Sequence, residues 1–165
     1  MAQSSICRRI LRKDMSLREP QRVTPLSNSE GIYIHYSAGT HSSDVDASLR
    51  AIGVIQRYHM GKGWSDIGYS WLVDDAGNIF EGRGWGVVGA HTRGYNDRSH
   101  AICYLGREQA PSNAALLAIC SLIAEHEERY GAGYVRAHGE VGRTACPGRH
   151  LIAWLEQGRP VSQVA

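Results

Sequence analysis

The sequence predicts an α/β fold in which a central mixed β-sheet is flanked by helices within a single domain. Short apolar runs, typical of buried strands, alternate with longer segments that have the period of an amphipathic helix. Two of the runs are separated by a tight turn, which adds an antiparallel hairpin to strands otherwise connected by helices. With 165 residues, no internal repeat and no low-complexity linker, the chain has the length of one domain.

Residues 1–30 are polar and irregular, and we expect them to form an extended N-terminal arm packed on the domain. The basic residues of the arm are expected to form a solvated face: Arg8, Arg9, Arg12 and Lys13. Residues 31–158 make up the folded domain, and residues 159–165 form a C-terminal tail.

The domain opens with a strand and a helix. Residues 32–36 form an apolar run that predicts a buried strand. Asp44 or Asp46 can cap the helix that follows, which runs to about His59. One face of this helix is apolar and is expected to point to the core: Val45, Leu49, Ile52 and Ile55.

A hairpin and a further strand occupy the middle of the chain. Residues 70–73 and 78–81 are apolar runs on either side of Asp74-Asp75-Ala76-Gly77, a sequence that predicts a hairpin turn. Residues 101–105 form another apolar strand, in which Cys103 is expected to be a small core residue.

Two helices separated by a short strand end the domain. The clearest helix spans residues 112–130, with Ser112 or Asn113 as its cap and Gly131 as its end. Its apolar stripe is Leu116, Ile119, Cys120, Ile123 and Tyr130. Residues 134–138 form the short strand. The last helix starts near Pro147 and is expected to face the core with Leu151, Ile152, Trp154 and Leu155.

Composition excludes several classes of function. The net charge of +2 leaves no electrostatic footprint for nucleic acid, and no apolar run reaches the length of a membrane span. The N-terminus lacks the apolar core of a signal peptide, so we expect a protein made in the cytoplasm or a piece cut from a larger protein. The four cysteines show no CxxC pairing and no scaffold spacing. We therefore expect a monomer that neither binds nucleic acid nor inserts into a membrane.

Two histidines and one cysteine indicate a metal site. His35 and His138 each close a strand, and a Pro-Gly corner after Cys146 can present its sulfur at a sheet edge. Two imidazoles and one thiolate can hold Zn²⁺ and leave a fourth position open for water, as in catalytic zinc sites. Sequence spacing alone does not show that His35 lies near His138 and Cys146 in the folded chain. His138 and Cys146 can also be a core pair, or the base and nucleophile of a thiol peptidase.

Six segments carry a more specific signal: Ile34-His35, Trp64-Ser65-Asp66-Ile67-Gly68-Tyr69, residues 77–84, Gly89-Ala90-His91, Gly94-Tyr95-Asn96 and residues 144–148. In this order they resemble the zinc-dependent N-acetylmuramoyl-L-alanine amidase family of type 2, which includes phage lysozyme-type amidases and peptidoglycan recognition proteins. The resemblance covers roughly residues 31–155. Several motifs in a fixed order are far more specific than any single short pattern.

The resemblance implies the fold of that family, with residues 31–158 as the zinc amidase catalytic domain. It implies one Zn²⁺ per chain, held by His35, His138 and Cys146. Tyr69 and Thr144 match active-site positions, where they would hold the tetrahedral intermediate by hydrogen bonds. The residues expected to line the substrate groove are Tyr36, Trp64, His91 and Asn96.

The sequence departs from the family pattern in places that leave the three ligands intact. Tyr36 stands where a second histidine is common, and Ala101 replaces a usual glycine. An Arg-x-x-Trp element near the start is reduced to Arg12-Lys13-Asp14-Met15. The histidines without a partner pattern are expected to be surface or structural residues: His41, His59, His100, His126 and His150.

The function implied is that of a peptidoglycan hydrolase, which cleaves the amide between the lactyl group of N-acetylmuramic acid and L-alanine through a zinc-activated water. A compact chain without an export signal or wall-binding repeat favours the catalytic domain of a phage endolysin, made in the host cytoplasm and acting on the cell wall. The alternative is a noncatalytic module that binds muramyl peptide. Cys146 favours the enzyme, because loss of this thiolate typically accompanies loss of zinc in such modules.

Overall fold

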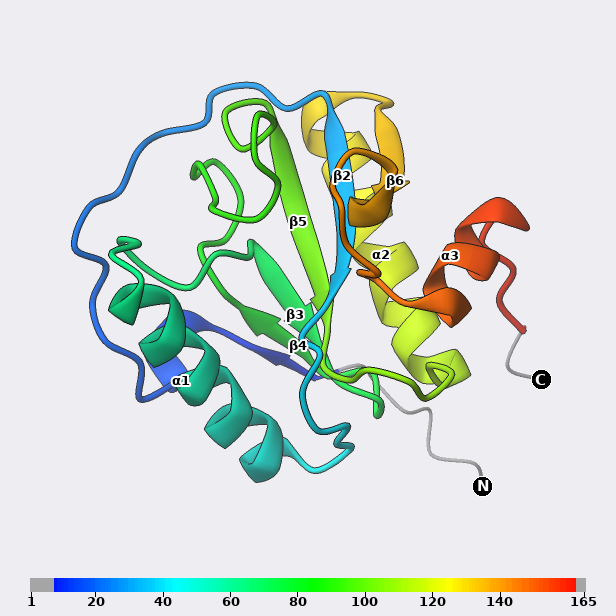
Figure 1. Ribbon diagram of the computed structural model, residues 1–165, viewed down its shortest axis with the longest axis horizontal. Coiled ribbons are helices and arrows are strands. Elements are labelled where there is room, and N and C mark those ends of the chain that lie inside the picture. The colour runs from blue at the N-terminus through cyan, green and yellow to red at the C-terminus, as the bar shows by residue number, and fades with distance from the viewer. Residues whose placement is uncertain (1–7, 163–165) are drawn as a thin grey trace.

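A six-stranded mixed β-sheet runs through the middle of the structure, a computed structural model that describes residues 8–162 (Figure 1). Across the sheet the strands lie in the order β1-β4-β3-β5-β2-β6. In chain order the strands and α-helices are β1 (Arg9–Ile10), β2 (Gly31–Tyr36), α1 (Val45–Gly61), β3 (Trp71–Val73), β4 (Ile79–Glu81), β5 (Ser99–Tyr104), α2 (Asn113–Tyr130), β6 (Tyr134–Ala137) and α3 (Arg149–Glu156). The α/β class with a mixed sheet is as predicted.

The sheet topology brings His35 to the carboxyl ends of parallel strands. β2 lies between β5 and β6 and is parallel to both. In this register His35 is opposite Cys103 of β5, and Ile34 is opposite Ala137, the last residue of β6. His138, which follows Ala137, therefore comes close to His35. Ligand sites of such sheets gather at this end of the strands.

The helices begin and end for the local reasons that the sequence indicates. At the start of α1, the Asp44 carboxylate accepts a hydrogen bond of 2.8 Å from the amide of Ala47. At the start of α2, the Ser112 hydroxyl oxygen accepts one of 3.0 Å from the amide of Ala115. Gly131 ends α2 with a φ of 87°, a conformation that favours glycine. The predicted caps are confirmed.

The hairpin is also confirmed: β3 and β4 are antiparallel, and the Asp74 carboxylate closes their turn by accepting hydrogen bonds from the amides of Ala76 and Asn78. The sheet has a core on each face, and Figure 1 shows α1 on one side and α2 on the other. The α2 face is built around Ile32, Ile34, Trp71, Ile102, Tyr104, Ile119, Leu122 and Trp154. The α1 face is built around Ile10, Met15, Ile52, Ile67, Leu72, Phe80, Cys103 and Leu105.

The predicted stripe of α2 is partly wrong. Leu116 and Cys120 are half-buried, and Cys120 is not the core residue that its sequence context suggests. The positions buried instead are Ala115, Ala118, Leu122 and His126, beside the correctly predicted Ile119 and Ile123. A search for large apolar side chains overlooks Ala115, Ala118 and His126, but it does not account for the missed Leu122.

The N-terminal arm contains more structure than its sequence suggests. Residues 1–7 lie outside the described part, but Arg9–Ile10 form strand β1 at the sheet edge and Arg12–Asp14 form a 3-10 helix. The chain then sweeps round the outside of the domain to enter β2 (Figure 1). Met15 lies in the core on the α1 face, at the position where the family motif has tryptophan.

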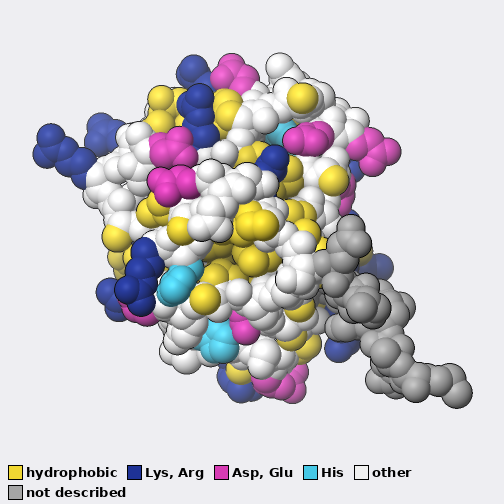
Figure 2. Space-filling view, turned by 90° about the vertical axis from the view of Figure 1, so that its right-hand side faces the viewer, with side chains coloured by type: hydrophobic (Ala, Val, Ile, Leu, Met, Phe, Trp, Pro, Cys, Tyr) yellow, Lys and Arg dark blue, Asp and Glu magenta, His cyan; other side chains and the backbone are white. Residues whose placement is uncertain are grey.

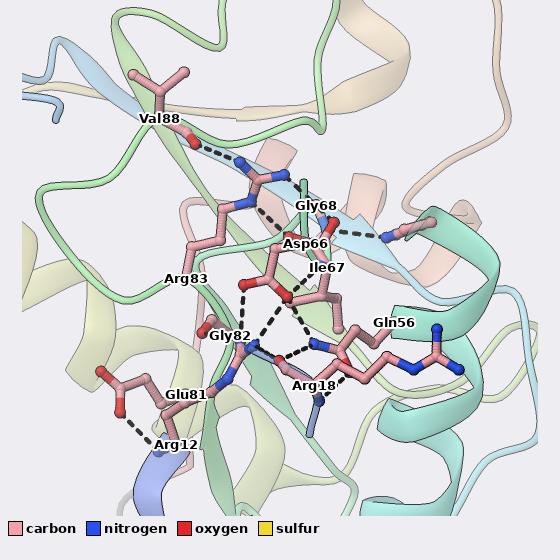
Figure 3. A network of polar contacts seen from close by, with 11 residues as sticks. Arg12, Arg18, Gln56, Asp66, Ile67, Gly68, Glu81, Gly82, Arg83 and Val88 are labelled. Atoms are coloured by element: carbon pink, nitrogen blue, oxygen red, sulfur yellow. Dashed lines mark hydrogen bonds and ion pairs between the residues drawn. The ribbon is translucent and has the colours of Figure 1, made fainter. Parts of the chain in front are cut away.

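The prediction of a solvated basic face is wrong for Arg12, which is half-buried, whereas Arg9 is exposed but is engaged by partners. Arg9 forms an ion pair with Glu125 of α2, and its guanidinium lies 4.9 Å from the ring centroid of Trp71. Arg12 forms a two-pronged ion pair with Asp66, with distances of 2.9 and 3.0 Å (Figure 3). A local pattern could not reveal these partners, because they are more than 50 residues away in the chain.

Asp66 is the centre of a buried polar network that holds the segment before Tyr69 (Figure 3). Its carboxylate also accepts hydrogen bonds from the Gln56 side chain and from the amide of Ile67. Arg83 completes the support, since its guanidinium donates to the carbonyl oxygen of Ile67 at 2.7 Å. The arm, α1 and the loop after β4 are thereby tied to the segment that carries Tyr69.

The face that carries α3 and β6 has hydrophobic side chains gathered around a hollow (Figure 2). Between these two elements lies a cavity of about 490 Å³, lined by Val135, Ile152 and Leu155 among others. α3 therefore packs against the sheet edge without filling the space beside it. No helix within residues 8–162 has both the length and the apolar composition needed to cross a membrane.

Candidate metal centre and substrate pocket

The donor atoms of His35, His138 and Cys146 converge at the carboxyl end of β2. One donor atom from each residue lies within 4.8 Å of the other two, and within residues 8–162 this is the one such group of three or more metal-ligand side chains. The ring centroids of His35 and His138 are 4.5 Å apart. His35 and Cys146 are buried and His138 is half-buried, so the group is reached from the His138 side.

The separation between the donor atoms of His35 and Cys146 fits a zinc ion. Nδ1 of His35 lies 3.5 Å from Sγ of Cys146. Zinc bonds of about 2.3 Å to sulfur and about 2.0 Å to nitrogen, at a tetrahedral angle, separate the two donors by about 3.5 Å. Two imidazoles and a thiolate therefore offer a suitable donor set at a suitable distance, with room for one more ligand.

Burial sets the protonation of the three side chains before any metal binds. It lowers the pKa of His35 well below its usual value and also lowers the pKa of His138, so both rings are neutral and can act as ligands. It raises the pKa of the Cys146 thiol to about 11, although the amide of Tyr36 donates a hydrogen bond to the sulfur. Binding a metal must therefore displace the thiol proton.

Tyr69 lies against the same group, with its ring centroid 5.3 Å from that of His35. Burial raises the pKa of its phenol well above the usual value, so it keeps its proton near pH 7. The backbone beside it is held by His59 of α1, whose Nδ1 accepts a 2.9 Å hydrogen bond from the amide of Gly68. The ring of a protonated tyrosine thus lies next to the candidate metal ligands.

The loop of residues 90–98 covers the other side of His35. Asn96 shapes it, because its side-chain oxygen accepts hydrogen bonds from the amides of His91 and Thr92, at 2.8 and 2.9 Å. His91 and Thr92 are both buried, and the Thr92 hydroxyl lies 3.2 Å from Nε2 of His35. Burial lowers the pKa of His91 to about 3, so this ring is neutral.

A pocket of about 420 Å³ opens next to the metal ligands, between this loop and the segment before Tyr69. His138 lines it together with three residues predicted for the substrate groove: Trp64, His91 and Asn96. The exposed side chain of Arg93 also lines it. Lys62 lies over the outer part of this wall, with its ammonium 4.3 Å from the ring centroid of Trp64.

Two predicted residues lie beside this pocket rather than in its lining. Tyr36 packs its ring close to Gly148, at the corner after Cys146. Thr144 is exposed, and its hydroxyl oxygen accepts a 3.2 Å hydrogen bond from the amide of Cys146. Thr144 also borders the separate cavity beside β6.

Sequence reasoning missed three residues that support the site: His59, Arg83 and Thr92. His59 and Arg83 hold backbone on either side of Tyr69, which requires knowledge of the folded chain. Thr92 had a usable signal, because it directly follows the Gly89-Ala90-His91 motif. Of the histidines expected to be surface or structural, His59, His100 and His126 are buried, and His41 pairs with Asp75.

Comparisons with known proteins agree with this fold. The family model described as N-acetylmuramoyl-L-alanine amidase matches residues 25–149. Peptidoglycan-recognition protein SC2 of Drosophila simulans is 38% identical over 129 residues, which are 74% of this chain and 69% of that protein. The endolysin of Klebsiella phage KP32 is 30% identical over 146 residues, 84% of this chain and 93% of the phage protein.

A solved structure of peptidoglycan recognition protein-LE in complex with tracheal cytotoxin, a monomeric diaminopimelic acid-type peptidoglycan, is similar with a TM-score of 0.86. It is 32% identical and covers 90% of this chain and 92% of that chain. Fold and sequence thus define a class of mixed-sheet domain shared by amidases, endolysins and peptidoglycan-recognition proteins. The chain belongs to the N-acetylmuramoyl-L-alanine amidase family, and the resemblance inferred from its motifs is confirmed.

Proposed function

We propose that this protein is a zinc-dependent N-acetylmuramoyl-L-alanine amidase, which hydrolyses the amide between the lactyl group of N-acetylmuramic acid and L-alanine of the stem peptide. The observation that carries the proposal is the convergence of His35, His138 and Cys146 within 4.8 Å beside an open pocket. A set of three such ligands is typical of catalytic zinc, whereas a structural zinc takes four.

The side chains around this group have the chemistry that amide hydrolysis needs. Zinc supplies a Lewis acid that polarises the scissile carbonyl and activates water near neutral pH. Tyr69, which keeps its proton, donates a hydrogen bond to the carbonyl oxygen as negative charge develops there. Thr144 accepts the amide proton of Cys146 and keeps its own hydroxyl proton for a second hydrogen bond to the intermediate.

The ligand of the pocket is the muramyl peptide of bacterial peptidoglycan. Trp64 gives an apolar wall, His91 and Asn96 line the pocket, and Tyr36 lies beside it near Gly148. The likeness to a recognition protein solved with a peptidoglycan fragment supports this choice of ligand. The likeness to a phage endolysin over 93% of its length supports a role in lysis of a bacterial host.

The test of the proposed function is amine release from purified cell walls. We expect new L-alanine amino termini with the wild-type protein, and at least about 100-fold fewer after Cys146→Ser, since the Lewis acid contributes several kcal/mol. Cys120→Ser is the matched control, because this half-buried thiol of α2 should leave the rate unchanged. Activity that survives both a chelator and Cys146→Ser excludes the mechanism, and wall binding without amine release indicates a recognition module.

Lysis of a host is tested separately, with bacterial cells whose outer membrane has been made permeable. The wild-type protein should clear such a suspension and Cys146→Ser should not. If the protein releases amines from isolated walls but leaves these cells intact, the amidase activity is supported and the role in lysis is excluded.

A further inference from the structure

The two ring nitrogens of His35 face different neighbours. Nδ1 is 3.5 Å from Sγ of Cys146, on the side of the proposed zinc site. Nε2 is 3.2 Å from the hydroxyl oxygen of Thr92, on the opposite side of the ring. A neutral imidazole carries its proton on one nitrogen only, and only the bare nitrogen can bind a metal. The role of Thr92 therefore decides which nitrogen is available.

His91 fixes the direction of the Thr92 hydroxyl proton. Nε2 of His91 is 3.3 Å from the carbonyl oxygen of Ser99, which can only accept, so this nitrogen carries the proton of the neutral ring. Nδ1 of His91 is then an acceptor, and it lies 3.0 Å from the Thr92 hydroxyl. The single hydroxyl proton of Thr92 thus goes to His91, and the hydroxyl oxygen is left to accept from His35.

His91 and Thr92 are buried, and the loop that carries them is held by hydrogen bonds. Thr92 is 1% exposed, and both its own amide and that of His91 donate to the Asn96 side chain. The loop thus holds the Thr92 hydroxyl between His91 and His35. The hydrogen bonds therefore run from the Ser99 carbonyl through His91 and Thr92 to His35, with one consistent arrangement of protons.

We infer that Thr92 is a positioning residue for the metal site, which holds the proton of His35 on Nε2 and leaves Nδ1 bare and directed at the cation, while His91 orients the Thr92 hydroxyl. The inference rests on the proposed function, because the cation is the zinc proposed above. It gives His91 a task inside the protein, since both of its ring nitrogens are engaged there. Partners of this kind typically change metal affinity 10- to 100-fold when removed.

The first measurement needs no substitution. Long-range ¹H–¹⁵N correlation spectra of the metal-free protein, with His35 assigned through its backbone, report which ring nitrogen carries the proton. We expect the proton on Nε2, and the zinc-loaded protein should show Nδ1 as the bound nitrogen. A proton on Nδ1 of His35 in the metal-free protein overturns the inference.

The second measurement compares zinc affinities by competition with a chromophoric chelator. Thr92→Val keeps the shape of the side chain and removes the hydroxyl, and we expect affinity to fall about 10- to 100-fold and the His35 tautomers to mix. Thr92→Ser keeps the hydroxyl and should restore affinity to within about threefold. Ser48→Ala is the matched control, because it removes a buried hydroxyl that bonds Asp74, away from the metal ligands.

The outcomes separate this inference from the proposed function. Wild-type protein that releases amines from cell walls, while Thr92→Val binds zinc as tightly as wild type, overturns the positioning role alone. Wild-type protein with the expected His35 tautomer and zinc affinity, but without amine release, overturns the amidase activity alone. If Thr92→Val does not fold, the tautomer of the wild-type protein and the affinity of Thr92→Ser decide the inference.

Discussion

Gly142 lies against the ring of His138, and at this position the absence of a side chain matters for the metal site. A Cβ atom there would stand 3.1 Å from Nε2 and 3.3 Å from Cδ2 of His138. Contacts of that length force the ring to move by a few tenths of an ångström. A displacement of this size takes up most of the roughly 0.5 Å within which the geometry of a metal site must be held.

We therefore expect Gly142→Ala to lower zinc affinity roughly 10-fold, because it displaces one of the three ligands. The measurement is competition with a chelator, with correct folding checked by circular dichroism. Gly61→Ala is the control, since a Cβ at that position meets nothing within 4 Å. Equal affinities for the two variants would show that the ring of His138 has room to adjust.

Two buried histidines away from the site, His100 and His126, should make the stability of the protein depend on pH. The Ser29 hydroxyl oxygen lies 3.0 Å from Nδ1 of His100 and 2.8 Å from Nε2 of His126, and Nε2 of His100 accepts from the amide of Gly86. Burial lowers the pKa of His100 to about 3 and that of His126 to about 4. Both rings are therefore neutral in the folded protein at pH values where the unfolded chain already binds protons.

The unfolded chain binds these protons below about pH 6.5. The contribution of the two neutral rings to the unfolding free energy is therefore fully present above that pH and is lost as pH falls toward 4. Each ring should lower the unfolding free energy by about 2 kcal/mol between pH 7 and pH 5. The measurement is urea denaturation at several pH values. His126→Gln should reduce the number of protons taken up on unfolding by about one, whereas His150→Gln on α3 should not change it. A wild-type protein equally stable at both pH values contradicts the prediction.

At the scale of elements, the N-terminal arm is attached by charge as well as by packing. Asp66 is 1% exposed, and Arg12 supplies the cation that compensates its carboxylate. Removing one partner of a buried pair leaves an uncompensated charge, which typically costs about 3 to 5 kcal/mol. The Gln56 side chain and the amide of Ile67 still donate to the carboxylate, so we expect the lower end of this range.

Arg12→Ala should thus lower the unfolding free energy by about 3 kcal/mol, measured by urea denaturation at pH 7. Arg12→Lys should recover only part of it, because an ammonium cannot make the two-pronged contact. Lys13→Ala, a change at the exposed neighbouring position, is the control. If Arg12→Ala and Lys13→Ala were equally stable, the arm would be held by apolar contacts such as those of Met15 instead.

The contrast between α1 and the arm shows how far the sequence predicts this fold. The caps Asp44 and Ser112 and the turn at Asp74 act over a few residues, so local sequence was sufficient to place them. β1 has two residues, and its pairing with β4 depends on a partner about 70 positions away, so no local pattern marks it. The same limit applied to His100 and His126, whose partner Ser29 lies in the arm.

The candidate site shows the same division between residue types and their arrangement. Motifs pointed to the three candidate metal ligands and to Tyr69, and the folded chain brings these four side chains together. The supporting contacts of Thr92 and His59 could not be predicted, because each depends on the direction of one hydrogen bond between distant segments. The residue types of the candidate site were therefore easier to predict than the hydrogen bonds that orient their side chains.

The three candidate ligands join parts of the chain that are far apart in sequence. His35 ends β2, His138 follows β6, and Cys146 precedes α3. An ion that binds all three in the folded state, and does not bind the unfolded chain, stabilises folding by an amount that grows with its concentration. Zinc at about 1,000 times its dissociation constant should add about 4 kcal/mol to the unfolding free energy.

Urea denaturation of the wild-type protein with excess zinc and with a chelator measures this difference. We expect Cys146→Ser to lose most of the difference, because one ligand is missing, and Cys120→Ser to keep all of it. The comparison of the two serine variants is needed because thiols of the unfolded chain also bind zinc and reduce the net effect. If wild type and Cys146→Ser responded equally to zinc, the ion would be binding elsewhere, and the three converging side chains would be a packing feature of the core.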